Sequence, residues 1–128
     1  MPRDAIIIPN APPSVLPYSP GIRSGDHVFL SGATGVDPAT GQLVEGDVAA
    51  QAEQVFKNLA RVLAAAGLSL GDAIKCNVYL IDMGDFQAMN VVYARQFEAP
   101  YPARTTVAVA ALPGGARVEI ELVARQPA

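Results

Sequence analysis

The segment from Asp47 to Ala66 constrains the fold more than any other part of the sequence. Its apolar residues recur at the spacing of an amphipathic helix. Asp47 can accept hydrogen bonds from the free N–H groups at the helix start, and Gly67 can close the last turn in a left-handed conformation. Such a helix buries one face, so the rest of the chain must supply the surface on which it packs. The residues expected on that face are Val48, Ala52, Val55, Leu59, Val62 and Leu63.

Short runs of β-branched and apolar residues flank this helix on both sides. The polar Ser24–Asp26 turn between two of these runs predicts a hairpin. We expect a proline-rich loop from Ala11 to Pro20, and a second loop from Gly32 to Gly46, where Gly, Pro, Asp and Thr interrupt any apolar period. The expected strands are Ala5–Ile8, Gly21–Arg23, His27–Ser31, Ala73–Ile81, Arg104–Ala111 and Arg117–Ala124.

A second helix is expected after Asp85, which stands where a helix-initiating residue is common. The order of elements is then strands, helix, strand, helix, strands, which predicts an α+β fold with both helices on one face of a mixed sheet. The strand before this helix is expected to turn Ile74, Cys76, Val78 and Leu80 to one side. The apolar stripe of the second helix consists of Phe86, Met89, Tyr93 and Phe97.

Several strands are apolar on both sides, for example at Val107 to Ala110 and at Val118 to Val123. A sheet with helices on one face only would leave one of these sides exposed to water. Self-association that covers the second face is therefore expected.

Composition narrows the class of protein. A chain of 128 residues with 51% hydrophobic residues is expected to form a single domain, residues 1–128. A net charge of -3 argues against nucleic acid as the main partner, because phosphate binding needs an excess of Lys and Arg. One cysteine, Cys76, and one histidine, His27, cannot form a Cys/His zinc site within one chain. The apolar run Ala5–Ile8 is too short for a signal peptide or a membrane span, so a cytoplasmic protein is expected.

Six motifs, in this order from about Asn10 to Ala124, together resemble the RidA/YjgF-like reactive intermediate deaminases. The most specific of them are the Pro-Ala-Arg segment at 102–104 and the Val-Glu-Ile-Glu segment at 118–121. The full set is Pro17-Tyr18-Ser19, Leu30-Ser31-Gly32, Asp82 through Phe86 leading to Asn90 and Tyr93, Pro102-Ala103-Arg104-Thr105-Thr106-Val107, Leu112-Pro113, and Val118-Glu119-Ile120-Glu121.

This resemblance implies a chorismate-mutase-like sheet with two helices, assembled as a homotrimer with clefts between neighbouring subunits. It also implies hydrolysis of reactive enamine/imine intermediates, such as 2-aminoacrylate and 2-iminobutanoate, to 2-keto acids and ammonia. No cofactor or metal is implied, and the expected partner is a small imine or enamine carboxylate.

The resemblance assigns Arg104, Glu119 and Thr106 to catalysis. Arg104 would bind the substrate carboxylate with two parallel hydrogen bonds. Glu119 would act as the general base on the attacking water, with help from the backbone carbonyl of Thr106. Many family members have cysteine where this chain has Thr106, which removes any thiol chemistry there but leaves the backbone role.

Tyr18, Ser31 and Asn90 complete the expected substrate pocket. From the residues alone, each has an ordinary alternative, because Ser and Asn side chains usually satisfy backbone groups. Without the resemblance, Arg104 and Glu119 would likewise be interpreted as exposed strand residues. His27 matches no motif and is expected to be structural or at the surface, and Cys76 is expected to be a small buried apolar residue.

Three other functions remain open from the sequence. The substrate can be a larger conjugated enamine such as 2-aminomuconate, because an arginine recognises a carboxylate and says little about the rest of the molecule. The chain can also be a non-catalytic metabolite-binding, regulatory or chaperone-like protein. The third alternative is a ribonuclease, against which the acidic pI of about 4.9 argues.

Overall fold

The computed structural model describes residues 2–12 and 15–128. In this part of the chain a six-stranded mixed sheet has the order β1-β2-β3-β8-β6-β7, and a separate pair is formed by β4 and β5. The bounds are β1 (Asp4–Ala5), β2 (Gly21–Ser24), β3 (His27–Thr34), β4 (Val36–Asp37), β5 (Gln42–Leu43), α1 (Val48–Ala65), β6 (Ala73–Leu80), α2 (Phe86–Ala94), β7 (Ala103–Ala108) and β8 (Val118–Arg125). Short 3-10 helices occur at Leu70–Asp72, Met83–Asp85 and Pro113–Gly115.

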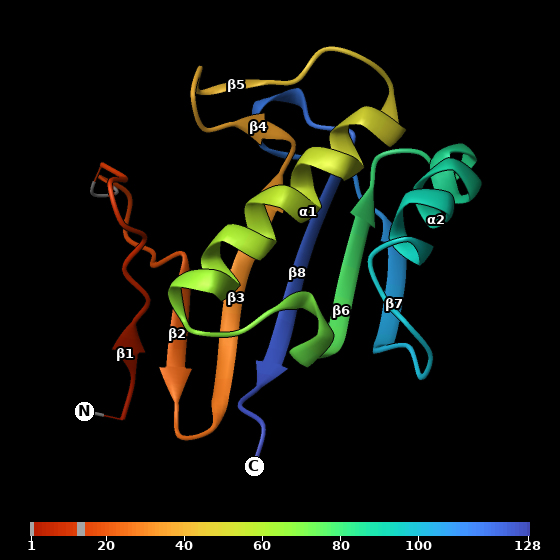
Figure 1. Ribbon diagram of the computed structural model, residues 1–128. Coiled ribbons are helices and arrows are strands. Elements are labelled where there is room, and N and C mark those ends of the chain that lie inside the picture. Colours follow the sequence, from red (N-terminus) through yellow and green to blue (C-terminus); the bar gives the residue numbers. More distant parts are fainter. Residues whose placement is uncertain (1, 13–14) are drawn as a thin grey trace.

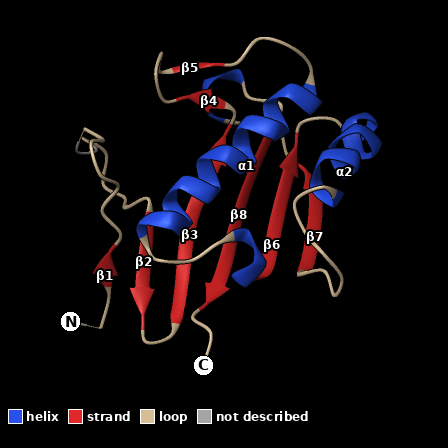
Figure 2. Ribbon diagram, viewed as in Figure 1, coloured by secondary structure: helices blue, strands red, loops and turns tan. Residues whose placement is uncertain are grey.

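Both helices cover the same face of the sheet (Figure 1). The strands pair antiparallel except for β6 and β7, which run parallel. Figure 2 shows no helix in front of β1, whereas α1 crosses the central strands and α2 lies over β6 and β7. The prediction of an α+β fold with two helices on one face of a mixed sheet is therefore confirmed.

The start and end of α1 follow the sequence signals. The Asp47 carboxylate accepts a hydrogen bond from Ala50 N at 3.1 Å, and Gly67 adopts a positive φ of 76° just after the helix. The helix buries five of the six residues of the predicted face against the sheet, together with Phe56, while Val62 is only partly buried. Phe56 packs edge-on against Tyr93 and Phe97 at 5.8 and 5.9 Å between ring centres, and this contact places α2 beside α1.

Several boundaries differ from the prediction. The expected strand Ala5–Ile8 is replaced by the shorter β1, although Ile6 N still donates to Gly21 O at 2.9 Å. The Gly32–Gly46 segment is not a simple loop, because β3 continues to Thr34 and the β4–β5 pair follows. In the expected proline-rich loop, residues 13 and 14 lie outside the described residues.

Ile74 was expected on the buried side of β6, yet its side chain is 44% exposed. The pairing register between β6 and β8 shifts between Ala73 and Lys75, so an extra residue interrupts the alternation. After this irregularity Cys76, Val78 and Leu80 are buried under the helices, as predicted.

The face of the sheet opposite the helices has no cover within the described chain (Figure 1). Phe29 on β3 and Val107 on β7 are 46% and 41% exposed. The same face carries a row of polar side chains, including Lys75, Asn77 and Glu121.

Candidate active site

Arg104 lies on β7 and turns its side chain toward α2. In the parallel pairing Arg104 is opposite Cys76, which is buried under the helices, so both side chains point to that face. The guanidinium donates from Nη1 to Asn90 Oδ1 at 2.7 Å. Its central carbon lies 4.7 Å from the centre of the Tyr93 ring and 5.6 Å from that of Phe86. Residues 86, 90 and 93 share one side of α2, since they are spaced at about one and two turns.

Arg104 has no carboxylate partner among the described residues. Its charge is partly withdrawn from water and stabilised by the two ring faces and the Asn90 amide. A partly buried guanidinium without a counter-ion is an attractive site for an anion, because the protein has already ordered the side chain. We name Arg104, Asn90, Phe86 and Tyr93 the arginine cluster.

The surroundings of this cluster supply no other charge. The Cys76 thiol and the Tyr93 hydroxyl lie nearby, and burial raises the pKa of each above its ordinary value. Both groups are therefore neutral near pH 7. The hydroxyls of Tyr93 and Thr106 are buried without a hydrogen-bond partner in the described part of the chain. The prediction that Cys76 is a small buried residue is confirmed.

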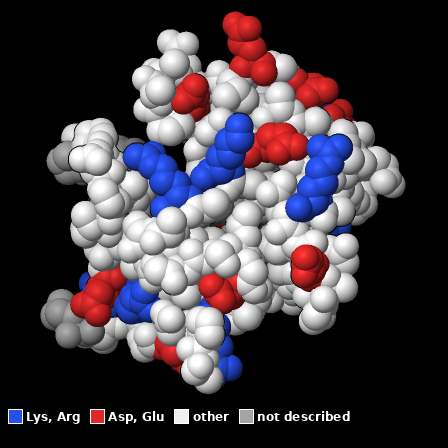
Figure 3. All heavy atoms as spheres, viewed as in Figure 1, with Lys and Arg blue, Asp and Glu red and all other residues white. Residues whose placement is uncertain are grey.

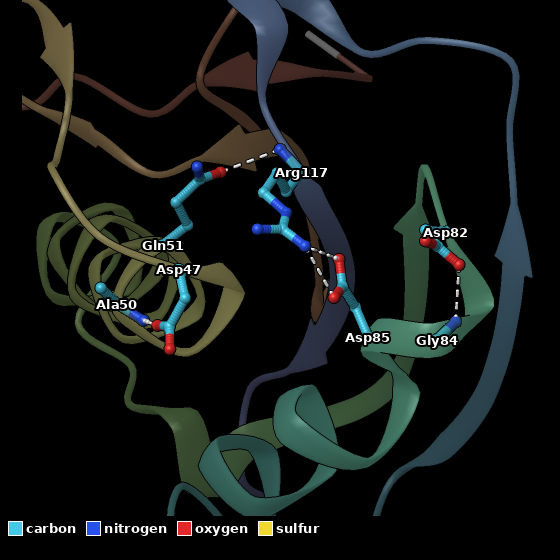
Figure 4. Close-up of polar contacts among 7 residues, drawn as sticks. All are labelled: Asp47, Ala50, Gln51, Asp82, Gly84, Asp85 and Arg117. Atoms are coloured by element: carbon cyan, nitrogen blue, oxygen red, sulfur yellow. Dashed lines mark hydrogen bonds and ion pairs between the residues drawn. The ribbon is translucent and has the colours of Figure 1, made fainter.

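A partly buried ion pair holds the start of α2 to the start of β8 (Figure 4). Arg117 Nη2 donates to both carboxylate oxygens of Asp85, at 2.8 and 2.9 Å, and the Asp85 side chain is only 13% exposed. Arg117 N donates to Oε1 of the buried Gln51 on α1 at 2.8 Å. Asp85 does precede the helix as predicted, but its carboxylate binds Arg117 rather than capping N–H groups. These contacts connect α1, α2 and β8 next to the arginine cluster.

A second group of predicted residues lies where β3 is irregular. Leu30 pairs with Leu122 and Ala33 with Ile120, so three steps along β3 match two along β8. The extra residue forms a β-bulge at Ser31 and Gly32, which redirects the strand there. Ser31 Oγ donates to Ser19 O at 2.6 Å. Ser31, Gly32 and Tyr18 line one pocket of about 340 Å³.

The Glu119 carboxylate lies directly over Gly32. A Cβ atom at position 32 would be 2.5 Å from Glu119 Oε2, so only glycine leaves room for this carboxylate. Burial, and after it the charge of Glu121, raises the pKa of the Glu119 carboxyl above its ordinary value. We name Tyr18, Ser31, Gly32 and Glu119 the carboxylate cluster.

Glu119 and its neighbour Glu121 differ in their surroundings. Glu121 accepts hydrogen bonds from Tyr79 Oη at 2.6 Å and from Asn77 Nδ2 at 3.1 Å. Within the described residues no donor is bonded to Glu119. Glu119 is thus a partly buried carboxylate with no bonded donor in the described residues, which leaves its oxygens available to bind a water.

The arginine and carboxylate clusters do not meet within one protomer. Arg104 faces the helices, whereas Glu119 pairs with Tyr79 on the opposite face of the sheet. Along the sheet the two residues are two strands and three residues apart, or about 14 Å between Cα atoms from standard strand spacings. Arg104 thus contacts Asn90 and is on the same strand as Thr106. Glu119 lies over Gly32, and Gly32 also lines the pocket that contains Tyr18 and Ser31.

Sequence reasoning missed three contributors to these clusters. Gly32 was quoted as part of a motif but given no role, and its need for glycine becomes visible only from the position of Glu119. Tyr93 and Phe86 were assigned to an apolar stripe, and Tyr93 is indeed buried and Phe86 partly buried, but they also contact Arg104. Their spacing with Asn90 on one helix face was the available signal.

Other candidate groups lie apart from both clusters. His27 is at the surface, with Nδ1 2.8 Å from Asp26 Oδ1, as predicted. Among residues 2–12 and 15–128, no three or more His, Cys, Asp or Glu side chains are arranged to hold a metal ion. None of the helices in the same residues has the length and hydropathy needed to cross a membrane.

Comparison with known proteins covers nearly the whole chain. The sequence model of the family described as Endoribonuclease L-PSP matches residues 8–126. Protein DfrA of Myxococcus xanthus is 48% identical over 126 residues, which span 97% of this chain and 96% of DfrA. The 2-iminobutanoate/2-iminopropanoate deaminase of Mus musculus is 43% identical over 124 residues, 97% of this chain and 92% of that protein.

A solved structure agrees with the fold. The crystal structure of RidA from the Antarctic bacterium Psychrobacter sp. PAMC 21119 superposes with a TM-score of 0.88 and 46% sequence identity. The match covers 95% of this chain and 98% of that one.

Proposed function

The chain belongs to the Endoribonuclease L-PSP family, which includes the RidA/YjgF-like proteins, and from this premise we propose that it is an enamine/imine deaminase. Its substrates would be small reactive intermediates such as 2-aminoacrylate and 2-iminobutanoate, and its products the 2-keto acids and ammonia. The name of the mouse relative, 43% identical, supports this activity. The observation that carries the proposal is the ordered guanidinium of Arg104, which has no carboxylate partner in the described residues.

In this proposal Arg104 binds the substrate carboxylate. Asn90 accepts one N–H of the guanidinium at 2.7 Å, and the other N–H groups are available for a two-pronged contact. The rings of Tyr93 and Phe86 keep the fork in place, so little conformational freedom is lost on binding.

Glu119 acts on the water. Its raised pKa makes it a better proton acceptor than an ordinary glutamate. The water oxygen bonds to the carbon of the protonated imine while Glu119 takes a water proton, which gives a carbinolamine. Glu119 then returns this proton to the nitrogen. The carbon–nitrogen bond breaks, ammonia leaves, and the hydroxyl oxygen forms the keto C=O as its proton passes to solvent. The backbone carbonyl of Thr106 helps to hold the water, and Tyr18 and Ser31 form the wall of the pocket.

The proposal includes a homotrimer with sites between subunits. Arg104 and Glu119 lie on opposite faces of one sheet, so a substrate can touch both only if a second protomer supplies one of them. The uncovered apolar side chains of Phe29 and Val107 give the protomers a reason to associate. Strand β7 is the last strand of the sheet in the described residues, so its outer backbone groups are open to a neighbour. Light scattering at micromolar concentration should give the mass of a trimer, and a monomer mass would exclude the shared site.

One assay tests the activity. A threonine dehydratase with threonine produces 2-iminobutanoate, which semicarbazide traps as an adduct. Adding this protein should suppress the adduct and speed the appearance of 2-oxobutanoate. An unchanged adduct level would contradict the deaminase and favour the non-catalytic metabolite-binding alternative. Ribonuclease activity has the weaker support, since the chain has a net charge of -3.

A further inference from the structure

Two carboxylates lie side by side on the face of the sheet opposite the helices, which we name the open face. Glu119 and Glu121 are two residues apart on β8, so their side chains point to the same side, with the Cα atoms roughly 7 Å apart. The cross-strand partner of Glu119 on β6 is Tyr79, and that of Glu121 is Asn77. Like charges this close repel each other unless donors or cations offset them.

Both donors that β6 supplies here bind Glu121. Tyr79 Oη donates to Glu121 Oε1 at 2.6 Å, and Asn77 Nδ2 donates to the same oxygen at 3.1 Å. Tyr79 is directly opposite Glu119, yet its hydroxyl reaches diagonally to Glu121, as a long aromatic side chain can. This hydrogen bond raises the pKa of the Tyr79 hydroxyl, which therefore keeps its proton and remains a donor at neutral pH. Glu121 is thus held by two hydrogen bonds, whereas the described residues donate none to Glu119.

In residues 2–12 and 15–128, no basic side chain pairs with either carboxylate. The helix-covered side differs, because acidic and basic side chains lie next to one another there (Figure 3). Lys75, the cation of β6, donates to Thr105 Oγ1 on β7 at 3.0 Å. On β3 the residue opposite Glu119 is the uncharged Thr34. The other charged residues at these strands bind one another at the far end of β3 and β8; they are Asp26, His27 and Arg125.

The charge of Glu121 therefore acts on Glu119 without a counter-charge from the described residues. A negative charge beside a carboxyl group disfavours its ionised form, so it favours a proton on that group. Burial, and after it the charge of Glu121, raises the pKa of Glu119 in this direction. A general base works by accepting a proton, so a neighbouring negative charge strengthens it without contacting the substrate.

We propose that Glu121 is a positioning residue of the reaction: held by Tyr79 and Asn77, it keeps a negative charge beside Glu119 and so favours transfer of the water proton to Glu119. This inference rests on the proposed function for the role of Glu119. It also gives a reason for two glutamates on one face of β8, since general-base catalysis by itself needs only one. Because Tyr79 donates to Glu121, the oxygens of Glu119 are left for the water.

The first test is the acid limb of the pH profile of kcat/KM for 2-iminobutanoate. Glu121→Gln removes the charge but keeps an oxygen that can accept from Tyr79 and Asn77. Its acid limb should move to lower pH by roughly half a unit, the effect of one charge about 7 Å away in water-like surroundings. Tyr79→Phe should cause a smaller shift in the same direction, because Glu121 keeps its charge but loses the bond that holds it. The pH dependence of the imine itself is common to all variants.

Glu45→Gln is the matched control. Glu45 is an exposed glutamate between β5 and α1, and the same substitution there should leave the acid limb in place. A merely structural role of Glu121 would lower the stability in urea, or lower kcat equally at every pH, without moving the acid limb. An unmoved acid limb in Glu121→Gln, or an equal shift in Glu45→Gln, would overturn the inference and leave the deaminase intact.

Carbon-13 NMR of the glutamate carboxyl groups measures the same coupling without substrate. The signal that is missing in Glu119→Gln assigns Glu119. Its titration midpoint should fall by roughly half a unit in Glu121→Gln and stay unchanged in Glu45→Gln. If the parent protein hydrolyses no imine, the proposed function fails instead, and the NMR midpoint alone decides whether Glu121 acts on Glu119. An unchanged midpoint in Glu121→Gln would then contradict the inference as well.

Discussion

Replacing Gly32 by alanine should separate the chemistry of the carboxylate cluster from the stability of the fold. Gly32 does not have a positive φ, so alanine meets no backbone penalty there. Its Cβ would be 2.5 Å from Oε2, 2.9 Å from the carboxyl carbon and 3.1 Å from Cγ of Glu119. Ordinary contacts lie near 3.5 Å, so the Glu119 carboxylate must move by about 1 Å. All three atoms belong to one flexible side chain, which can rotate at small cost.

The expected result is a loss of turnover with little change in folding. A displacement of about 1 Å from the reacting position costs up to roughly a hundredfold, so kcat for 2-iminobutanoate should fall about tenfold to a hundredfold. The free energy of unfolding should change by less than about 1 kcal/mol, as measured by urea denaturation.

Two other glycines serve as controls. Gly71→Ala would place its Cβ 3.5 Å from Ser69 Oγ, an ordinary contact, and should alter neither property. Gly35→Ala would meet backbone atoms of Gln51 at 2.9 Å, which cannot rotate away, and should destabilise the fold. If Gly32→Ala kept kcat within about twofold of the parent, catalysis would not depend on the position of the Glu119 carboxylate over Gly32.

Three further variants test the other contacts. Arg104→Ala should lower kcat/KM by about one to two decades, because a charged hydrogen bond contributes about 1.5–3 kcal/mol. Arg104→Lys should recover only part of this loss, because an ammonium lacks the planar fork of the guanidinium. A loss of less than about twofold in Arg104→Ala would exclude the anchor role. Glu119→Gln should lose most turnover, yet in urea denaturation at neutral pH it should be at least as stable as the parent. The reason is that a carboxyl whose pKa is raised in the folded state lowers the stability of the protein when it is ionised. In the parent this loss of stability should disappear as the pH falls through the raised pKa. In the parent, activity should fall on the acid side at a pH above the ordinary glutamate range, and an acid limb within that range would contradict the general-base role. Arg117→Met should destabilise the fold by roughly 1–2 kcal/mol, because it leaves the mostly buried Asp85 carboxylate unpaired; unchanged urea denaturation would show that the pair contributes little.

Local signals in the sequence were sufficient for the helices and for most strands. The Asp47 cap and Gly67 both lie where the pattern predicted, because helix ends depend on neighbouring residues alone. The exceptions arise from the pairing of strands that are distant in sequence. The apolar run at Ala5–Ile8 forms only a two-residue strand, since pairing with β2 stops there, and Ile74 is exposed because the register shifts beside it.

The grouping of the site residues could not be predicted in the same way. Alternation along β8 does place Glu119 on the side opposite Ile120, as expected. That Arg104 is on the other face depends on the parallel pairing of β6 with β7 and on the strand order, which are set by contacts far apart in sequence.

The central claim is that Arg104 of one protomer and Glu119 of another act on the same substrate. It is tested most directly by mixing two inactive variants, Arg104→Ala and Glu119→Gln, under conditions that allow subunit exchange. In a random equal mixture, each shared site has both wild-type groups with a probability of about one quarter, so roughly a quarter of the parent activity should return. If both groups acted from the same chain, every site would contain a defect, and activity that stayed at the level of the separate variants would contradict the account.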